Sequence, residues 1–306
     1  MILDALFSPE FLNAALRATT PILLAALASA IASRAGIINM ALEGIMLFSA
    51  LFGVLFSAAF QNAWMGLFIT MIIGGIIGFM LAFFVLKLKT DEILAAIAIN
   101  LIANGATVLI LLAVSGDRGV SSSVPSVPLP KIDIPIIENI PYFGEVISNQ
   151  NIITYISLLM VVAVHLFLYK TPLGLRIRAV GENKNAAESV GISSKKVQYI
   201  ALILSGVLAS MGGFFLSGGY MTNFTTGMSA GRGFIALAAS AMGGNTAIGS
   251  FLVSLLFGAA SALSNILQLG AWPHEIIQMI PYITTILGLG IYSYNRMKKR
   301  EKLNGK

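Results

Sequence analysis

Long apolar runs alternate with short polar stretches along the chain, and this pattern restricts its fold more than any other feature. Apolar residues make up 57% of the 306 residues and charged residues only 10%, whereas soluble domains carry about 25% charge. So much apolar surface cannot be hidden in one aqueous core. The sequence therefore predicts an all-α, polytopic transmembrane helical bundle.

Nine segments are candidate membrane helices, and most approach the roughly 20 residues that a helix needs to cross a bilayer. They are Ala18–Ser33, Met40–Phe60, Trp64–Leu86, Ile93–Val114, Ile152–Tyr169, Val197–Ser217, Gly233–Gly244, Ile248–Leu269 and Glu275–Tyr294. Gly233–Gly244 is the weakest of them, and we expect a broken or re-entrant helix there. We expect residues 1–306 to form a single transmembrane domain.

The basic residues predict the orientation of the chain. Of the 19 Lys and Arg residues, two are Lys87 and Lys89, six lie between residues 170 and 196, and six lie between residues 296 and 306. Such clusters at the ends of apolar runs usually face the cytoplasm. This places the N-terminus outside and the C-terminus in the cytoplasm. Residues 115–151 then form an extracytoplasmic loop, and residues 170–196 form a cytoplasmic loop.

Small residues recur at every fourth position in several of these segments. Gly74 and Gly78 form a GxxxG pair, and Ser250, Ser254 and Gly258 continue the same spacing in a later segment. Small side chains let helix backbones approach closely in lipid, where dispersion forces drive packing. The sequence therefore predicts a densely packed bundle.

Several chemistries are missing from the sequence. It has no cysteine and only two histidines, His165 and His274, so no metal site or cofactor is expected. Residues 227–231, with Ser229 at the centre, match the GxSxG pattern of serine hydrolases. An intramembrane hydrolase is therefore one alternative, although the Gly- and Thr-rich surroundings favour a flexible loop. Since the basic residues gather at the ends of apolar runs, no nucleic-acid partner is expected.

The stretch 174–196 is polar and basic, yet it lies between two very apolar segments. Asn183–Val190 is predicted to be a short helix, with Asn183 as N-cap and Gly191 just past its C-terminus. Ala186, Ala187 and Val190 would form a small apolar stripe on it. A helix this short needs a surface to pack on. A groove of another protein suits such small residues. A solvated connector and a helix lying on anionic lipid are the alternatives.

Four stretches of the sequence resemble the permeases of one group of ABC importers, which serve ribose and other sugars, branched-chain amino acids and nucleosides. They are "GLRIRAVGENKNAAESVGI", "LASAIASRAGIINMALEGIMLFSALFG", "DEILAAIAINLIAN" and "GFIALAASAMGGNTAIGSFLVSLLFG". The likeness covers roughly Thr20–Asn295. The block "INMALEGIMLFSA", which contains Glu43, looks most like the nucleoside-type permeases.

This resemblance implies a transport subunit in the bacterial cytoplasmic membrane rather than an enzyme. A separate cytoplasmic ATPase would hydrolyse ATP, a second permease chain would complete a heterodimer, and an extracytoplasmic binding protein or lipoprotein would deliver the substrate. It assigns the contact with the ATPase to Glu182, Asn183, Ala186, Ala187 and Gly191. A nucleoside is the expected substrate, with a simple sugar or a branched-chain amino acid as alternatives. A passive channel is the other non-enzyme alternative.

Polar side chains within the apolar segments are candidates for the substrate path, because such groups usually face the bundle interior or a cavity. They are Asn39, Glu43, Asn100, Asn104 and Asn265. A structural role is the alternative for each. Asn39 and Glu43 lie where they can stabilise a helix N-terminus, and the amides can form hydrogen bonds between helices.

Overall fold

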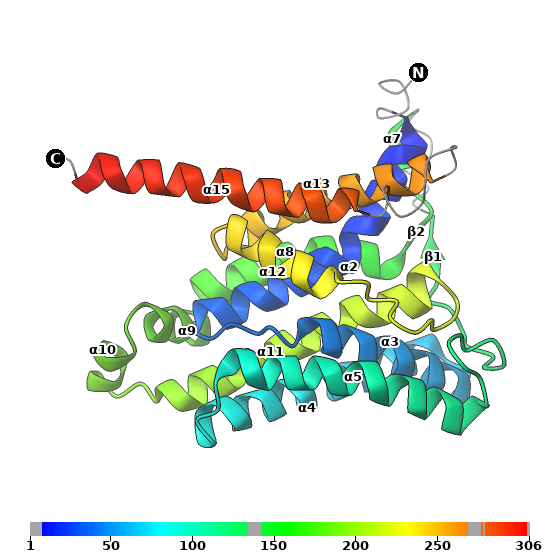
Figure 1. The fold of residues 1–306 in the computed structure, drawn as a ribbon, viewed down its shortest axis with the longest axis horizontal. Helices are drawn as coiled ribbons and strands as arrows, with labels where there is room; N and C mark the ends of the chain where they lie inside the picture. Colours follow the sequence, from blue (N-terminus) through cyan, green and yellow to red (C-terminus); the bar gives the residue numbers. More distant parts are fainter. Residues whose placement is uncertain (1–7, 134–141, 269–276, 278, 305–306) are drawn as a thin grey trace.

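The computed structural model describes residues 8–133, 142–268, 277 and 279–304, and its regular structure is almost entirely helical (Figure 1). The α-helices are α2 (Pro9–Arg34), α3 (Leu42–Ala59), α4 (Ala63–Ala82), α5 (Glu92–Ser115), α7 (Phe143–Ile147), α8 (Ile152–Lys170), α9 (Pro172–Glu182), α10 (Lys184–Ser189), α11 (Ser194–Phe214), α12 (Arg232–Met242), α13 (Ala247–Leu267) and α15 (Ile280–Asn304). The π-helical turns η1 (Phe83–Lys87) and η2 (Phe215–Tyr220) extend α4 and α11, and the strands β1 (Lys131–Ile132) and β2 (Gln150–Asn151) pair antiparallel. The predicted helical bundle is confirmed.

Seven helices among the described residues are long and apolar enough to cross a membrane, so the predicted count of nine is not confirmed. The predicted segment Gly233–Gly244 corresponds to α12, which has 11 residues. A helix of that length is only about 16 Å long, roughly half the hydrocarbon thickness. The predicted segment Glu275–Tyr294 lies partly outside the described residues, and its described part belongs to α15, which is not among the seven.

The centre of the bundle is formed by α2 and α11. Most of the apolar window of each is buried, 83% and 78%, against 28% for α5 and α8 at the periphery. Helix α2 packs against α8, α11, α12 and α13, whereas α11 also packs against α3 and α4. The central helices are thus shielded from lipid by their neighbours.

Glycines let these helices touch through their backbones. A Cβ atom on Gly74 would collide with the carbonyl oxygen of Gly206, and one on Gly78 would collide with that of Leu202. On the other side of the bundle, Gly258 of α13 lies against Thr19 of α2 in the same way. The close packing predicted from the spacing of Gly74, Gly78 and Gly258 is therefore present.

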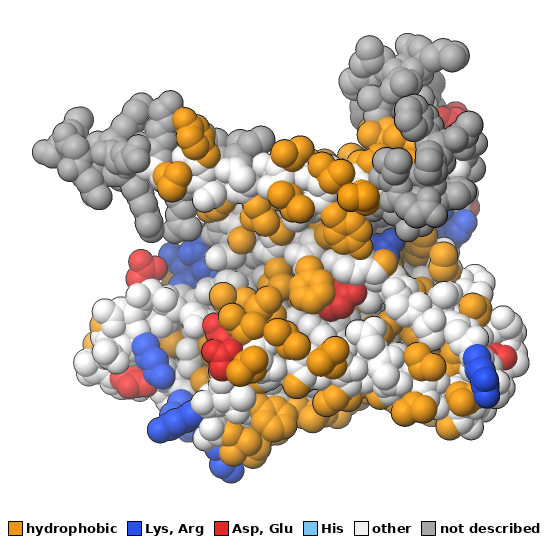
Figure 2. Space-filling view, viewed as in Figure 1, with side chains coloured by type: hydrophobic (Ala, Val, Ile, Leu, Met, Phe, Trp, Pro, Cys, Tyr) orange, Lys and Arg blue, Asp and Glu red, His pale blue; other side chains and the backbone are white. Residues whose placement is uncertain are grey.

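The two ends of the bundle differ. Figure 1 shows α9, α10, the turn between η1 and α5, and the C-terminal end of α15 together at one end, on the left. The start of α2 lies at the opposite end with α7, β1 and β2. The three basic clusters of the sequence therefore belong to the same end. Between the two ends, Figure 2 shows hydrophobic side chains across the middle of the molecule on the face that Figure 1 also presents, as a membrane environment requires.

The loop after α5 closes over the segment that precedes α12. Ser121 N donates to Phe224 O (2.9 Å), Phe224 N donates to Ser121 Oγ (2.8 Å), and Leu129 N donates to Gly218 O (2.8 Å). Within the loop, Ser123 donates from its backbone and its hydroxyl to Asp117, and these bonds lower the pKa of that carboxyl. The loop is thus fixed to the end of the bundle.

The orientation can be tested with single cysteines, because the chain has none of its own. Ser122 and Ser189 are exposed. Ser122 belongs to the loop after α5 and Ser189 to α10, and Figure 1 shows these two elements at opposite ends of the bundle. We expect a membrane-impermeant maleimide to label the Ser122→Cys variant in intact cells, and the Ser189→Cys variant only after permeabilisation. The opposite labelling pattern would reverse the orientation inferred from the basic clusters.

Candidate functional site

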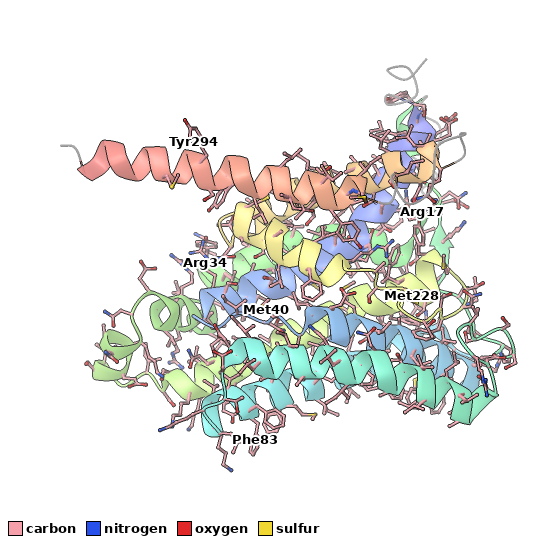
Figure 3. The ribbon with its side chains drawn as sticks, in the orientation of Figure 1. Arg17, Arg34, Met40, Phe83, Met228 and Tyr294 are labelled. Carbon is pink, nitrogen blue, oxygen red and sulfur yellow. The ribbon has the colours of Figure 1, made fainter. Side chains whose placement is uncertain are left out.

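The chain is not helical between α2 and α3, and two asparagines stabilise this break. Asn39 Nδ2 donates to Ser205 Oγ (2.9 Å), while its Oδ1 accepts from Ala41 N (3.1 Å). Asn100 of α5 donates from Nδ2 to Met40 O (2.9 Å) and accepts at Oδ1 from Gly44 N (2.8 Å). Backbone groups inside a membrane bundle need such partners wherever the helical bonds stop. Figure 3 shows Met40 in this break.

Glu43 joins the start of α3 to the start of α12. Its two carboxylate oxygens accept from Gly231 N and Gly233 N, each at 2.8 Å, and its side chain is buried. Figure 1 shows both helices beginning within the bundle rather than at its end. The N-terminus of a helix carries a partial positive charge, so it stabilises a carboxylate at this position. Glu43 thus satisfies the first turn of a half-length helix in the interior.

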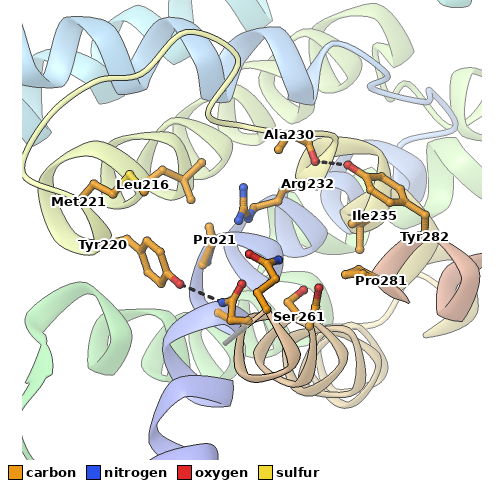
Figure 4. A pocket seen from close by; sticks show the side chains of 14 residues that line it. Pro21, Leu216, Tyr220, Met221, Ala230, Arg232, Ile235, Ser261, Pro281 and Tyr282 are labelled. Carbon is orange, nitrogen blue, oxygen red and sulfur yellow. Dashed lines mark hydrogen bonds between the residues drawn. The ribbon is translucent and has the colours of Figure 1, made fainter. Parts of the chain in front are cut away.

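A cavity of about 450 Å³ is lined in part by the first turn of α12 (Figure 4). Its volume is within the range of about 300–1,000 Å³ that is typical of small-molecule sites. The polar and aromatic residues that line it come from η2, α12, α13, the position just after α13, and α15: Tyr220, Arg232, Ser261, Ser264, Asn265, Gln268 and Tyr282. None of the described residues that line the cavity is acidic.

The two tyrosines of the cavity are held in place by hydrogen bonds. Asn265 Nδ2 donates to Tyr220 Oη (3.3 Å), and Tyr282 Oη donates to Ala230 O (2.6 Å), as the dashed lines in Figure 4 show. The two rings lie on opposite sides of Arg232 in that view. The cavity therefore combines aromatic surface with amide and hydroxyl groups.

Arg232 is the cation of this cavity. Its Nη1 donates to Met228 O (2.9 Å) and Ser229 O (3.3 Å), and its Nε and Nη2 have no hydrogen-bond partner among the described residues. The residues predicted from the sequence for the substrate path do not include it. The sequence could have pointed to this residue, because Arg232 is the only Lys or Arg between Lys196 and Arg296. An ionisable residue in such an apolar region usually has a functional role.

The five residues proposed for the substrate path lie in different surroundings. Asn39, Glu43 and Asn100 hold the break and the start of α12. Asn104 is exposed on α5, and its Nδ2 donates to Asn100 O (3.0 Å) of the same helix. Asn265 is the one member of the five among the residues that line the cavity.

Ser229, the centre of the GxSxG pattern, is buried in the turn before α12, although a flexible loop was expected there. No hydrogen bond joins its hydroxyl to a histidine or a carboxylate among the described residues. His165 lies on α8, and His274 lies outside the described residues. The described part of the chain thus offers no base to activate this serine.

The short helix predicted over Asn183–Val190 is present as α10. Asn183 Oδ1 accepts from Ala186 N (3.0 Å), and Gly191 has a left-handed φ of +82° just past the helix. Only Ala187 of the expected stripe is buried within the chain, whereas Ala186 is exposed and Val190 is 75% exposed. Glu182, the last residue of α9, is also exposed. Of the expected apolar stripe, Ala186 and Val190 are therefore the residues that another protein could contact.

Helices α9 and α10 are connected to the interior through the end of α2. A Cβ atom on Gly181 would collide with Arg34 O, so α9 touches the backbone of α2 directly. The side chain of Arg34 donates from Nε to Asn245 O (2.7 Å) and from Nη2 to Gly244 O (2.8 Å), in the turn between α12 and α13. One end of the bundle thus links α9, the break after α2, and α12.

The role of Glu43 can be measured as stability. Glu43→Ala would leave Gly231 N and Gly233 N without their acceptors inside the bundle, at a cost of about 1–3 kcal/mol each. We expect a lower thermal unfolding midpoint of the purified protein in detergent, with Glu43→Gln between it and the parent. The matched control is Asn104→Ala, an exposed position that we expect to change stability by less than about 0.5 kcal/mol. An unchanged midpoint for Glu43→Ala would show that these bonds do not stabilise the bundle.

Comparisons with known proteins agree with this architecture. A family model described as "Branched-chain amino acid transport system / permease component" matches residues 11–289. The guanosine ABC transporter permease protein NupQ of Bacillus subtilis is 34% identical over 280 residues, which cover 88% of this chain and 87% of the relative. The nucleoside ABC transporter permease protein NupC of Lactococcus lactis is 29% identical, with coverage of 90% and 89%.

A third relative carries a different substrate name. The putative glucose ABC transporter permease protein TsgC13 of Haloferax volcanii is 31% identical, with coverage of 92% of this chain and 90% of the relative. No solved structure matches the chain. Because the family model covers most of the sequence and the helices are those of a membrane bundle, the chain belongs to the branched-chain amino acid transport system permease family and is a multi-pass plasma-membrane permease component of an ABC transporter.

Proposed function

We propose that this permease carries a nucleoside into the cell as part of an ATP-driven importer. The cavity beside α12 is the observation that supports this substrate most directly. Tyr220 and Tyr282 offer aromatic surface to a flat base, and Asn265, Gln268 and Ser261 offer hydrogen bonds to base edges and ribose hydroxyls. The relatives named for guanosine and nucleoside transport point to the same substrate class.

The same cavity argues against an amino acid. A zwitterion brings an ammonium group into the membrane interior, where it needs an anionic partner. The cavity contains Arg232 for a carboxylate, whereas the described residues that line it include no acidic side chain. A simple sugar is the second candidate, because its hydroxyls could pair with the amides and serines, and one relative is named as a putative glucose permease.

The proposed importer needs three further proteins. A cytoplasmic ATPase would hydrolyse the ATP and would bind α9 and α10 within residues 170–196. The residues exposed there include Glu182, Asn183, Ala186 and Val190. A second permease would complete a heterodimer. An extracytoplasmic binding protein or lipoprotein would approach the end that carries residues 115–151. This arrangement requires the N-terminus outside and the C-terminus in the cytoplasm.

The contacts at the cytoplasmic end suggest how movement of the ATPase would reach the cavity. A displacement of α9 would act on the backbone of α2 through Gly181, and on the turn after α12 through Arg34. The break after α2 leads directly to Glu43, which holds the first turn of α12. Both routes end at α12, whose first residue faces the cavity. Alternating access would follow from movement of this helix.

The proposed ATPase contact is tested with Val190→Arg. Because Val190 is 75% exposed, a charged side chain there should leave the bundle folded and disturb only a docked partner. We expect normal membrane abundance but at least a tenfold loss of uptake and of substrate-stimulated ATP hydrolysis in the reconstituted importer. Lys184→Ala, another exposed change in α10, is the control and should have less than a twofold effect.

Normal transport by Val190→Arg would contradict this contact. The Ala187→Arg variant tests this contact less well than Val190→Arg. Because Ala187 is buried within the chain, an arginine there should destabilise the permease itself. Uptake that continues after inactivation of the cognate ATPase would favour a passive channel instead.

The substrate class is tested by competition. We expect an excess of unlabelled guanosine or uridine to reduce uptake of a radiolabelled nucleoside by the reconstituted importer at least tenfold. Leucine at the same concentration should have no effect, because its ammonium group finds no acidic partner among the described residues that line the cavity. Uptake of labelled ribose or glucose, without uptake of any nucleoside, would replace the proposal with the sugar alternative.

A further inference from the structure

We propose that Arg232 makes this permease prefer 6-oxopurine nucleosides, such as guanosine and inosine, over adenosine. This inference rests on the proposed nucleoside transport and names the part of the substrate that the cavity distinguishes. Arg232 is the one cationic side chain among the described residues that line the cavity, and it is only half-buried, at the wall of the cavity.

Hydrogen bonds orient the guanidinium of Arg232 but occupy only one of its three nitrogens. Nη1 donates to the carbonyl oxygens of Met228 and Ser229, which fixes the plane of the group. Nε and Nη2 have no partner in the part of the chain that the structure describes. Figure 4 shows the side chain between Tyr220 on one side and Tyr282 on the other. Two donor nitrogens, which carry three N–H groups, are therefore available to a molecule in the cavity.

The backbone around Arg232 is held on both sides. Glu43 accepts from Gly231 N and Gly233 N, the residues that flank Arg232, and Tyr282 Oη donates to Ala230 O. A Cβ atom on Gly233 would lie 2.5 Å from Glu43 N, so only glycine permits this approach. The first turn of α12 is thus fixed before a substrate arrives. Glu43 acts as a positioning residue for Arg232 and is not among the residues that line the cavity.

The chemistry of arginine then distinguishes purines. A guanidinium only donates hydrogen bonds, and its planar fork matches two neighbouring acceptors. A 6-oxopurine presents O6 and N7, which are both acceptors. Adenine presents N7 beside the amino group at C6, which is itself a donor and faces the fork unfavourably. Arginine pairs in this way with guanine, and glutamine or asparagine pairs with N6 and N7 of adenine.

The other polar groups of the cavity suit the rest of such a molecule. The side-chain oxygens of Asn265 and Gln268 can accept from N1–H and, in guanosine, from the amino group at C2. Asn265 holds the ring of Tyr220 through its hydroxyl, and the guanidinium of Arg17 lies over one face of the ring, 5.1 Å from its centroid. The other face is the one that can stack with a base. The stacking contact serves purines in general, and the amide of Gln268 can instead present its N–H to the unprotonated N1 of adenine. The contact that distinguishes oxygen from nitrogen at C6 is therefore the one with Arg232.

The test is the ratio of guanosine to adenosine uptake by the complete importer in liposomes. Initial rates are measured at saturating nucleoside and saturating binding protein. Because the binding protein is identical in every sample, a change in this ratio between a variant and the parent comes from the permease. We expect Arg232→Gln to lower the ratio at least tenfold and to keep adenosine uptake within about threefold of the parent. Arg232→Lys, which keeps the charge but not the fork, should lower the ratio about twofold to fivefold.

Two further variants complete the experiment. Arg118→Gln removes an arginine from the exposed loop after α5 and should leave the ratio within twofold. Glu43→Gln should shift the ratio in the same direction as Arg232→Gln, by a smaller factor, if it positions the arginine. An unchanged ratio in Glu43→Gln would overturn that positioning role.

The outcomes separate this inference from the proposed function. Nucleoside uptake with an unchanged ratio in Arg232→Gln overturns the inference alone, and so does an equal loss of both nucleosides at normal membrane abundance. If Arg232→Gln does not reach the membrane, the ratio for Arg232→Lys decides in the same way. A parent importer that carries neither guanosine nor adenosine overturns both the proposed function and this inference.

Discussion

Every backbone N–H and C=O group inside the membrane needs a hydrogen-bond partner within the protein, and the functional region of this chain depends on how that requirement is met where helices stop. The break after α2 and the start of α12 both lie within the bundle. Asn39, Asn100 and Glu43 supply the missing partners from their side chains. Without them, these irregular segments would expose unpaired backbone groups to an apolar interior. With them, the half-length helix α12 can begin inside the bundle, beside a cavity.

The rest of the bundle supports this region by close packing. Gly74, Gly78 and Gly206 bring α4 and α11 into backbone contact, and Gly258 does the same for α13 and α2. The helices that carry the break and the cavity are thereby fixed to the central pair, α2 and α11. The cavity lies between α2, α12, α13 and α15, away from the contact of α4 with α11. One part of the bundle is thus a rigid support for another that contains the site.

The end of the bundle that carries α9 and α10 connects to the same region through few contacts. Arg34 holds the turn after α12, and Gly181 places α9 against the last residues of α2. Since α2 leads into the break and the break leads to Glu43, a single chain segment joins the surface of α9 and α10 to the wall of the cavity. A permease that responds to an ATPase needs such a connection, because the ATPase touches only the surface.

The sequence by itself determined the features that depend on near neighbours. Apolar runs located the long helices. The predicted Ile152–Tyr169 agrees almost to the residue with the observed Ile152–Lys170, whereas α2 begins at Pro9, nine residues before the predicted Ala18–Ser33. The cap at Asn183 and the glycine spacing in α4 followed from local patterns. The tertiary structure alone decided which polar residues meet. Glu43 binds backbone groups 188 and 190 residues away, and Ala187 rather than Ala186 turns inward. Periodicity predicts which faces are apolar, but the partner of each face depends on how helices distant in sequence pack together.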